Sequence, residues 1–138
     1  VGIYSGGAWL AERLARSLGV TDTGNIDVSF YRDDYAQKGL HPDVRPSQIN
    51  FDVNDATILL VDDVLYTGRT IRAVLNELFD YGRPAAVKLA VLVDRGQREL
   101  PVEANVAIAR AELPATQLLE LSRTPQGQLT FDVEAIAD

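Results

Sequence analysis

The chain has 138 residues, 46% of them hydrophobic and none of them cysteine, and its formal net charge is −7. This composition is typical of one globular domain with its own core, and the lack of cysteine excludes disulfides and cysteine-ligated metals. No run of about 18 apolar residues and no signal-peptide pattern occurs, so we expect a cytoplasmic protein with no membrane partner. The acidic charge repels nucleic acid on average, so RNA as a partner stays open but is not favoured.

The start of the chain is unusual. Val1 begins inside an apolar stretch, and the whole chain contains no methionine. We therefore expect residues 1–138 to form a single domain that lacks an N-terminal piece.

Apolar runs with strand character alternate with runs of helical period. Along the chain, strands are expected at residues 1–4, 26–31, 57–61 and 86–93. Two helices are expected around residues 9–18 and 71–78, closed by Gly19 and Gly82. Residues 32–52 contain two prolines and no sustained period, so they read as a long loop.

After Pro101 the pattern weakens to short strands near residues 106, 118–121 and 129–133, with a turn at residues 125–127. The alternation predicts an α/β fold with a mostly parallel central sheet flanked by helices. Ligands bind such sheets beyond the carboxyl ends of the strands. Three loops are expected to meet there, at residues 5–7, 62–69 and 94–101.

The most informative stretch is ILLVDDVLYTGRT, at residues 58–70. Asp62 and Asp63 follow a buried strand, and their carboxylates can accept hydrogen bonds from a vicinal diol. Thr67, Gly68, Arg69 and Thr70 open a helix, where backbone N–H groups and the helix dipole attract an anion. A ribose 5-phosphate has a diol on one side and a phosphate on the other, and it fits this order of groups.

Other interpretations of this stretch were weighed. A strand ending in two acids also resembles a magnesium-binding Walker B segment, but the glycine-rich loop with lysine that such sites need is absent from the sequence. A dinucleotide-binding glycine fingerprint is absent as well. The plainest alternative is a solvated strand end followed by a capped helix, and it becomes less favoured once the acids and the Thr-Gly-Arg-Thr run are taken together.

Residues 58–70 resemble the signature of type I phosphoribosyltransferases, which bind phosphoribosyl pyrophosphate (PRPP). The Val64, Leu65 and Tyr66 insert is similar to that of the PyrR family, the pyrimidine regulators and uracil phosphoribosyltransferases. Three further stretches support this resemblance: SFYRDDY at residues 29–35, GRPAAVKLAVLVDRG at 82–96, and RELP at 98–101. The resemblance implies the type I phosphoribosyltransferase fold, with a flexible hood loop at residues 32–52.

The resemblance also implies roles for particular residues. The catalytic acids, which would hold the ribose hydroxyls, are Asp62 and Asp63. The PRPP loop continues through Val64, Leu65, Tyr66, Thr67, Gly68, Arg69 and Thr70, and its last four residues would take the 5-phosphate. The pyrophosphate loop would be Ser5, Gly6 and Gly7. Near the pyrophosphate and its Mg²⁺, which would be held through the substrate and not by a dedicated protein site, would lie Asp94 and Arg95.

The implied activity is transfer of phosphoribose from PRPP to uracil, giving UMP and pyrophosphate, in a homo-oligomer linked to regulation of pyrimidine biosynthesis. The alternative is a catalytically weak or inactive regulator that senses PRPP or UMP and binds RNA or protein. Two departures from the family pattern bear on this choice: Gly6 stands where an arginine is common, and NVAIARAELPAT at residues 105–116 replaces the run that lines the uracil site. Tyr66 replaces the acid of many purine relatives, which argues against a purine substrate.

Overall fold

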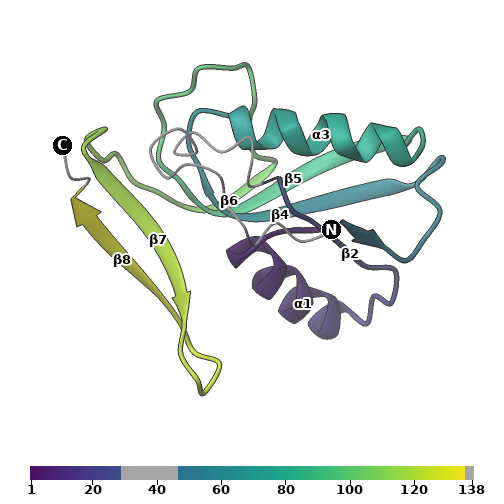
Figure 1. Cartoon of the computed structure of the whole chain (residues 1–138), viewed down its shortest axis with the longest axis horizontal. Helices are drawn as coiled ribbons and strands as arrows, with labels where there is room; N and C mark the ends of the chain where they lie inside the picture. Colours follow the sequence, from purple (N-terminus) through teal and green to yellow (C-terminus); the bar gives the residue numbers. More distant parts are fainter. Residues whose placement is uncertain (29–46, 136–138) are drawn as a thin grey trace.

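The computed structural model describes residues 1–28 and 47–135. Within them, a six-stranded sheet has the order β3-β2-β1-β4-β5-β6, and β7 and β8 form a separate two-stranded sheet (Figure 1). All neighbours in the large sheet run parallel except β2 and β3. The elements are β1 (Gly2–Ile3), α1 (Gly6–Leu18), β2 (Gly24–Ile26), β3 (Gln48–Ile49), β4 (Thr57–Leu65), α3 (Arg69–Tyr81), β5 (Ala86–Asp94), β6 (Val106–Arg110), β7 (Gln117–Arg123) and β8 (Leu129–Ala135).

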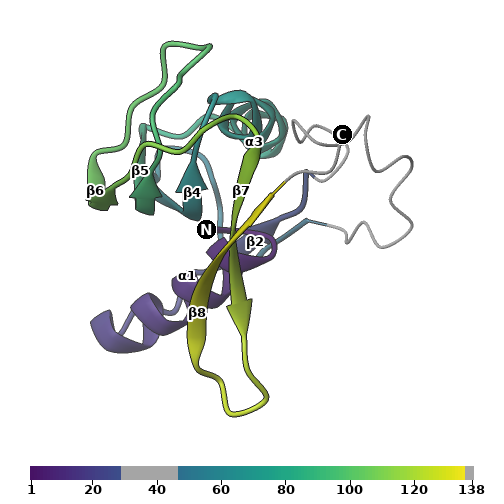
Figure 2. The ribbon, with the colours of Figure 1, turned by 90° about the vertical axis from the view of Figure 1, so that its left-hand side faces the viewer.

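The two described helices cover opposite faces of the large sheet, with α3 on one side and α1 on the other (Figure 2). Each follows a parallel strand and returns the chain to the far end of the sheet, as parallel connections require. The carboxyl ends of β1 and β4 therefore lie beside the starts of α1 and α3. Among the described residues, no helix has the length and apolarity needed to cross a membrane.

The core lies between the large sheet and α3. Ile71, Val74 and Leu78 are buried on one face of that helix, at the spacing expected for an amphipathic helix. They belong to one apolar cluster with buried residues of β4 and β5, among them Leu60 and Leu89. This packing fixes the start of α3 relative to the end of β4.

The hairpin of β7 and β8 stands apart from the large sheet (Figure 1). Its strands pair antiparallel from Gln117 with Ala135 to Arg123 with Leu129. It contacts α1 through the Arg123 guanidinium, which lies 4.8 Å from the centre of the Trp9 ring, and through a hydrogen bond from Arg13 to the Gly127 carbonyl. The turn expected at residues 125–127 is confirmed.

The mostly parallel sheet, both helices and the strand centred on residues 86–93 are confirmed. The expected end of the central strand at residue 61 is wrong, because β4 continues to Leu65 and includes both aspartates. The strand expected at 26–31 is β2, which begins earlier, at Gly24, and ends at Ile26; residues 27 and 28 are not in a strand, and residues 29–31 lie outside the described part of the chain. Residues 47–52 were expected to be loop but contain β3. The rest of the expected loop from residue 32 to 46, with most of SFYRDDY, also lies outside the described residues.

Replacing Leu78 by alanine tests the packing of α3. Its side chain is fully buried, so Leu78→Ala should lower the free energy of unfolding by about 2–5 kcal/mol. The neighbouring Phe79 is 52% exposed, and Phe79→Ala should lower it by less than about 1 kcal/mol. Urea unfolding of both variants measures the difference. Equal losses would contradict the described orientation of the helix.

Candidate functional site

Two parallel neighbours in the sheet end at different levels. Gly2 of β1 pairs with Val61, and β1 ends one residue later, at Ile3. Strand β4 continues four residues past that pair, to Leu65. The last part of β4 therefore extends beyond β1, and the start of α1 lies beside it. We call the step at the carboxyl edge of the sheet, where β4 extends past β1 and the first turn of α1 packs closely against it, the strand-end notch.

Asp62 and Asp63 lie in the part of β4 that borders the strand-end notch. Successive side chains of a strand point to opposite faces, so Asp62 shares a face with Leu60, and Asp63 shares the other with Val61. One carboxylate oxygen of Asp62 accepts the N–H of Asp63 at 2.8 Å, and one of Asp63 accepts the N–H of Val64 at 2.9 Å. Asp63 lies against the first turn of α1, whereas Asp62, on the other face of the strand, is buried, with 4% of its surface exposed.

The predicted pyrophosphate loop, residues 5–7, opens α1 next to Asp63. A Cβ added to Gly6 would lie 2.5 Å from an Asp63 carboxylate oxygen, and one added to Gly7 would overlap the Val61 carbonyl. Both glycines are therefore required by close approach of α1 to β4. The arginine common in the family pattern would not fit at position 6 unless Asp63 moved. The backbone N–H groups of the first helical turn are the groups of this segment that could bind an anion, and the predicted role of residues 5–7 stays a prediction.

The second predicted anion site, residues 67–70, is the turn into α3. Gly68 precedes the first helical residue with a φ of 97°, a conformation that favours glycine. Thr67 is buried, and its hydroxyl accepts the N–H of Arg69 at 3.2 Å. The Arg69 guanidinium forms an ion pair with Glu99 at 2.8 Å. The start of α3 thus has the ordered backbone that phosphate binding at a helix N-terminus uses.

Asp94 lies at the end of β5, and the structure brings it to the same edge of the sheet. One of its carboxylate oxygens accepts hydrogen bonds from Arg98 at 2.8 Å and Arg110 at 2.9 Å. The other accepts the N–H of Gly96 at 2.9 Å. Both oxygens are therefore engaged within the protein, and a role for Asp94 toward Mg²⁺ stays a prediction.

Arg95 is buried, with 2% of its surface exposed. Its guanidinium lies 4.0 Å from the centre of the Tyr66 ring and donates to the carbonyls of Pro114 and Gln117, each at 3.1 Å. The Nε atom has no hydrogen-bond partner among the described residues. Arg95 thus connects the PRPP loop to the start of β7, and its predicted role near pyrophosphate stays untested.

Arg98 and Glu99 were not singled out individually by the sequence analysis, although the structure places both against the PRPP loop. Arg98 donates to the Tyr66 carbonyl at 2.8 Å, and Glu99 pairs with Arg69. The four-residue spacing of Asp94 and Arg98 suggests a local ion pair from sequence alone. The contact with Tyr66 joins residues that are 32 positions apart, so no local sequence pattern indicates it.

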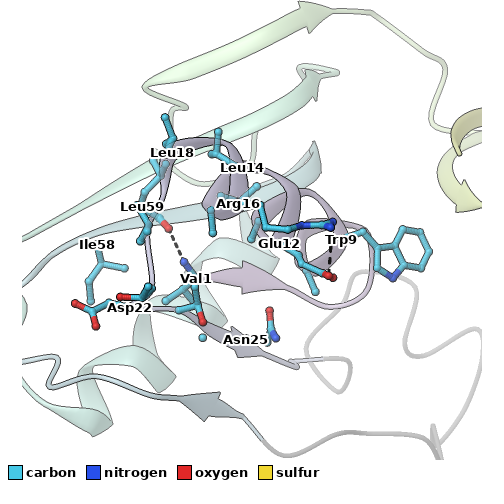
Figure 3. Close-up of a pocket in the computed structure, with 18 of the residues that line it drawn as sticks. Val1, Trp9, Glu12, Leu14, Arg16, Leu18, Asp22, Asn25, Ile58 and Leu59 are labelled. Carbon is cyan, nitrogen blue, oxygen red and sulfur yellow. Dashed lines mark hydrogen bonds and ion pairs between the residues drawn. The ribbon is translucent and has the colours of Figure 1, made fainter. Parts of the chain in front are cut away.

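Two further features bear on ligands. Within residues 1–28 and 47–135, no three histidine, aspartate or glutamate side chains gather as a metal site would need. A groove of about 1080 Å³ runs along α1 and the first half of β4, lined in part by Leu14, Leu18 and Leu59 (Figure 3). Arg16, on its wall, forms an ion pair with Glu12 at 3.7 Å. This largely apolar lining does not suit a phosphate, so we place no phosphate ligand there.

Known proteins that are similar to this chain are phosphoribosyltransferases and PyrR proteins. The phosphoribosyl transferase domain family matches residues 1–113. The bifunctional protein PyrR of Ralstonia nicotianae is 56% identical over 126 residues, which are 91% of this chain and 72% of that protein. PyrR of Nitrosococcus oceani is 50% identical over 139 residues, covering 99% and 77%. The crystal structure of a purine phosphoribosyltransferase from Pyrococcus horikoshii is 31% identical, with a TM-score of 0.62 over 80% of this chain and 68% of that one.

Acid titration tests the ion-pair cluster around Asp94. The hydrogen bond from Arg98 lowers the pKa of Asp94, and the N–H of Gly96 and the charge of Arg110 act in the same direction, whereas burial opposes them. A depressed native pKa stabilises the fold above the unfolded value of about 3.9, and this contribution is lost as the pH falls through the native pKa. Asp94→Asn should therefore destabilise the protein more at pH 7 than at pH 3. Urea unfolding at both pH values measures this, with Asp80→Asn at an exposed site as the control. A loss independent of pH would contradict the cluster.

Proposed function

The chain belongs to the PyrR family of phosphoribosyltransferases, and we propose that it binds PRPP in the strand-end notch and transfers phosphoribose to uracil. The products would be UMP and pyrophosphate. The observation that carries the proposal is that Asp63 meets the first turn of α1, while β4, which contains both aspartates, leads through residues 66–68 directly into α3. Two helix N-termini with an acidic strand edge between them match a sugar that has phosphate groups at both ends.

The placement of PRPP follows from the charges of this arrangement. Its 5-phosphate would lie at the start of α3, where Thr67 and Thr70 can donate hydroxyl groups. Its pyrophosphate would lie at the first turn of α1, near Gly6 and Gly7. Its ribose hydroxyls would donate to Asp62 and Asp63, because a charge-assisted hydrogen bond to a carboxylate is strong.

Magnesium fits this site through the substrate. Mg²⁺ prefers oxygen ligands and commonly bridges phosphate groups and one or two carboxylates. The carboxylate beside the first turn of α1 is Asp63, and it would hold the ion together with the pyrophosphate oxygens. When bound, the ion would neutralise charge on the pyrophosphate leaving group.

The reaction breaks the bond between ribose C1 and the pyrophosphate oxygen, which leaves with the electron pair. The uracil nitrogen N1 then bonds to C1 and loses its proton. As the first bond breaks, positive charge develops on the ribose, as it does in glycoside cleavage. The carboxylates of Asp62 and Asp63 would stabilise that charge because they are fixed by backbone N–H groups before the substrate arrives.

Uracil is proposed as the base because of Tyr66. Its carbonyl and ring are both held, by Arg98 and Arg95 respectively, at the position where many purine enzymes have an acid. The solved relative from Pyrococcus horikoshii is nevertheless a purine phosphoribosyltransferase. A test of the base must therefore include purines.

A regulatory role is the second part of the proposal. The curated relatives are named bifunctional, and position 6 of this chain is glycine, so it supplies no guanidinium to the pyrophosphate. A protein that binds PRPP well but transfers it slowly would suit a sensor. On the described surface, Arg13 and Arg16 are engaged with Gly127 and Glu12, and the net charge is −7, so we do not favour RNA as the partner.

PRPP binding tests the site directly. PRPP with Mg²⁺ should raise the melting temperature, because a ligand at 100 times its Kd adds about 2.7 kcal/mol to the stability of the native state. The double variant Asp62→Asn/Asp63→Asn should lose most of this shift, since it keeps the shape of the diol site but removes its charge. Asp132→Asn/Glu134→Gln removes the same charge from exposed positions of β8 and should keep the shift. An undiminished shift in the first double variant would refute the diol site.

Product formation with a panel of bases tests the reaction. We expect uracil to be the preferred base, at a rate well below about 10 s⁻¹, the median for enzymes. The measurement is release of pyrophosphate and of the nucleotide with uracil, hypoxanthine and guanine. Faster conversion of a purine would overturn the assignment of the base. Uracil turnover at or above about 10 s⁻¹ would overturn the sensor interpretation.

A further inference from the structure

The PRPP loop is held from one side by residues 98–100. Arg98 makes three hydrogen bonds, to the Tyr66 carbonyl at 2.8 Å, the Val102 carbonyl at 2.7 Å and the Asp94 carboxylate at 2.8 Å. The next two residues, Glu99 and Leu100, donate their N–H groups to the Thr67 carbonyl at 2.9 and 3.1 Å. The carbonyls of two successive peptide units therefore face the same short segment.

The orientation of these carbonyls sets the orientation of the N–H groups behind them. In a planar trans peptide the C=O and N–H bonds point in opposite directions. Because the Tyr66 and Thr67 carbonyls face residues 98–100, the N–H groups of Thr67 and Gly68 face away from that segment. These two peptide units immediately precede α3, so their N–H groups continue the anion-binding start of the helix.

We infer that Arg98 is a positioning residue, which holds the Tyr66 carbonyl so that the turn into α3 presents its N–H groups to the 5-phosphate of PRPP. The inference rests on the proposed function for the identity of the ligand. Arg98 is suited to this role because a planar guanidinium can hold three acceptors in fixed directions. Its side chain is 21% exposed, so its hydrogen bonds are only partly open to competition from water.

Arg110 offers a matched control. It donates to the same oxygen of Asp94, at 2.9 Å, but its side chain is 74% exposed, and its one hydrogen bond in the described structure goes to Asp94. Both arginines therefore neutralise the same carboxylate, whereas Arg98 alone of the two also reaches the PRPP loop. A difference between variants at these positions reports the contact with Tyr66 and not the loss of positive charge near Asp94.

The experiment compares wild type with Arg98→Gln, Arg98→Lys and Arg110→Gln. Hydrogen–deuterium exchange of the unliganded proteins should show faster exchange of residues 66–70 in Arg98→Gln and no change there in Arg110→Gln. The KM for PRPP should rise roughly tenfold to a hundredfold in Arg98→Gln, the scale expected when binding groups are misplaced, while the KM for uracil changes little. Arg98→Lys keeps the positive charge but not the planar guanidinium with its several donors. Its exchange rates and its KM for PRPP should therefore lie between those of wild type and Arg98→Gln.

Each outcome decides one point. Equal exchange and equal KM for PRPP in Arg98→Gln and Arg110→Gln would overturn the inference, as would a rise confined to the KM for uracil. If Arg98→Gln does not fold, Arg98→Lys carries the same comparison, and unchanged exchange in it would count against the inference. A wild-type protein that binds no PRPP would overturn the proposed function, and the exchange pattern would still decide whether Arg98 fixes the turn.

Discussion

The different positions at which β1 and β4 end, at the carboxyl edge of the sheet, are the constraint on which the candidate site depends. Because β1 stops one residue after Gly2 pairs with Val61, the chain turns into α1 while its neighbour continues. The end of β4 is thereby left without a strand on that side, and its acids border a notch instead of a sheet interior. A longer β1 would pair with Asp63 and Leu65 and would remove the notch. Glycine at the start of α1 allows the helix to approach the end of β4, because a side chain at Gly6 would meet Asp63.

A second consequence concerns electrostatics. The protein is acidic, yet its proposed ligand has two phosphate-bearing ends and is negatively charged. Among the described residues, attraction for this ligand would therefore come from local groups and not from net charge. The starts of α1 and α3 supply partial positive charge at both ends of the notch, and Mg²⁺ would offset part of the pyrophosphate charge. The arginines of this region are mainly engaged elsewhere, Arg95 and Arg98 with carbonyls and Arg69 with Glu99. Among the described residues, the proposed site combines the N–H groups of two helix starts with the carboxylates of Asp62 and Asp63, so the geometry of the turns is part of how it would bind the ligand.

The sequence was most informative where apolar periodicity is long and regular. Strands β4 and β5 and helix α3 follow from their runs of branched residues and from the buried face of the helix. The continuation of β4 through two aspartates was not predictable from pattern, because adjacent acids are typical of a strand end. They are tolerated inside the strand since each carboxylate accepts the N–H of the next residue, on an edge that has no neighbouring strand. Strand β3, with two residues, is too short to leave a periodic signal.

The motif in residues 58–70 predicted which residues gather at the site but not what holds them there. The acids, the turn and Gly68 are local in sequence, whereas Gly6 and Gly7 lie far away in the chain, and the proposed chemistry of sugar and phosphate follows from the order of groups in the motif. The support comes from residues 94–102, through contacts such as that of Arg98 with the Tyr66 carbonyl, which joins positions far apart in the chain. Every residue has a backbone carbonyl, so the sequence alone does not indicate which carbonyl will accept a hydrogen bond from a given arginine. The motif therefore predicts the type of ligand, whereas the packing that supports the turn appears only in the folded chain. The proposed selectivity for the base would depend on residues still further from the motif. Arg95 connects Tyr66 to the carbonyl of Pro114, in the part of the chain that departs most from the family pattern, and to that of Gln117, the first residue of β7.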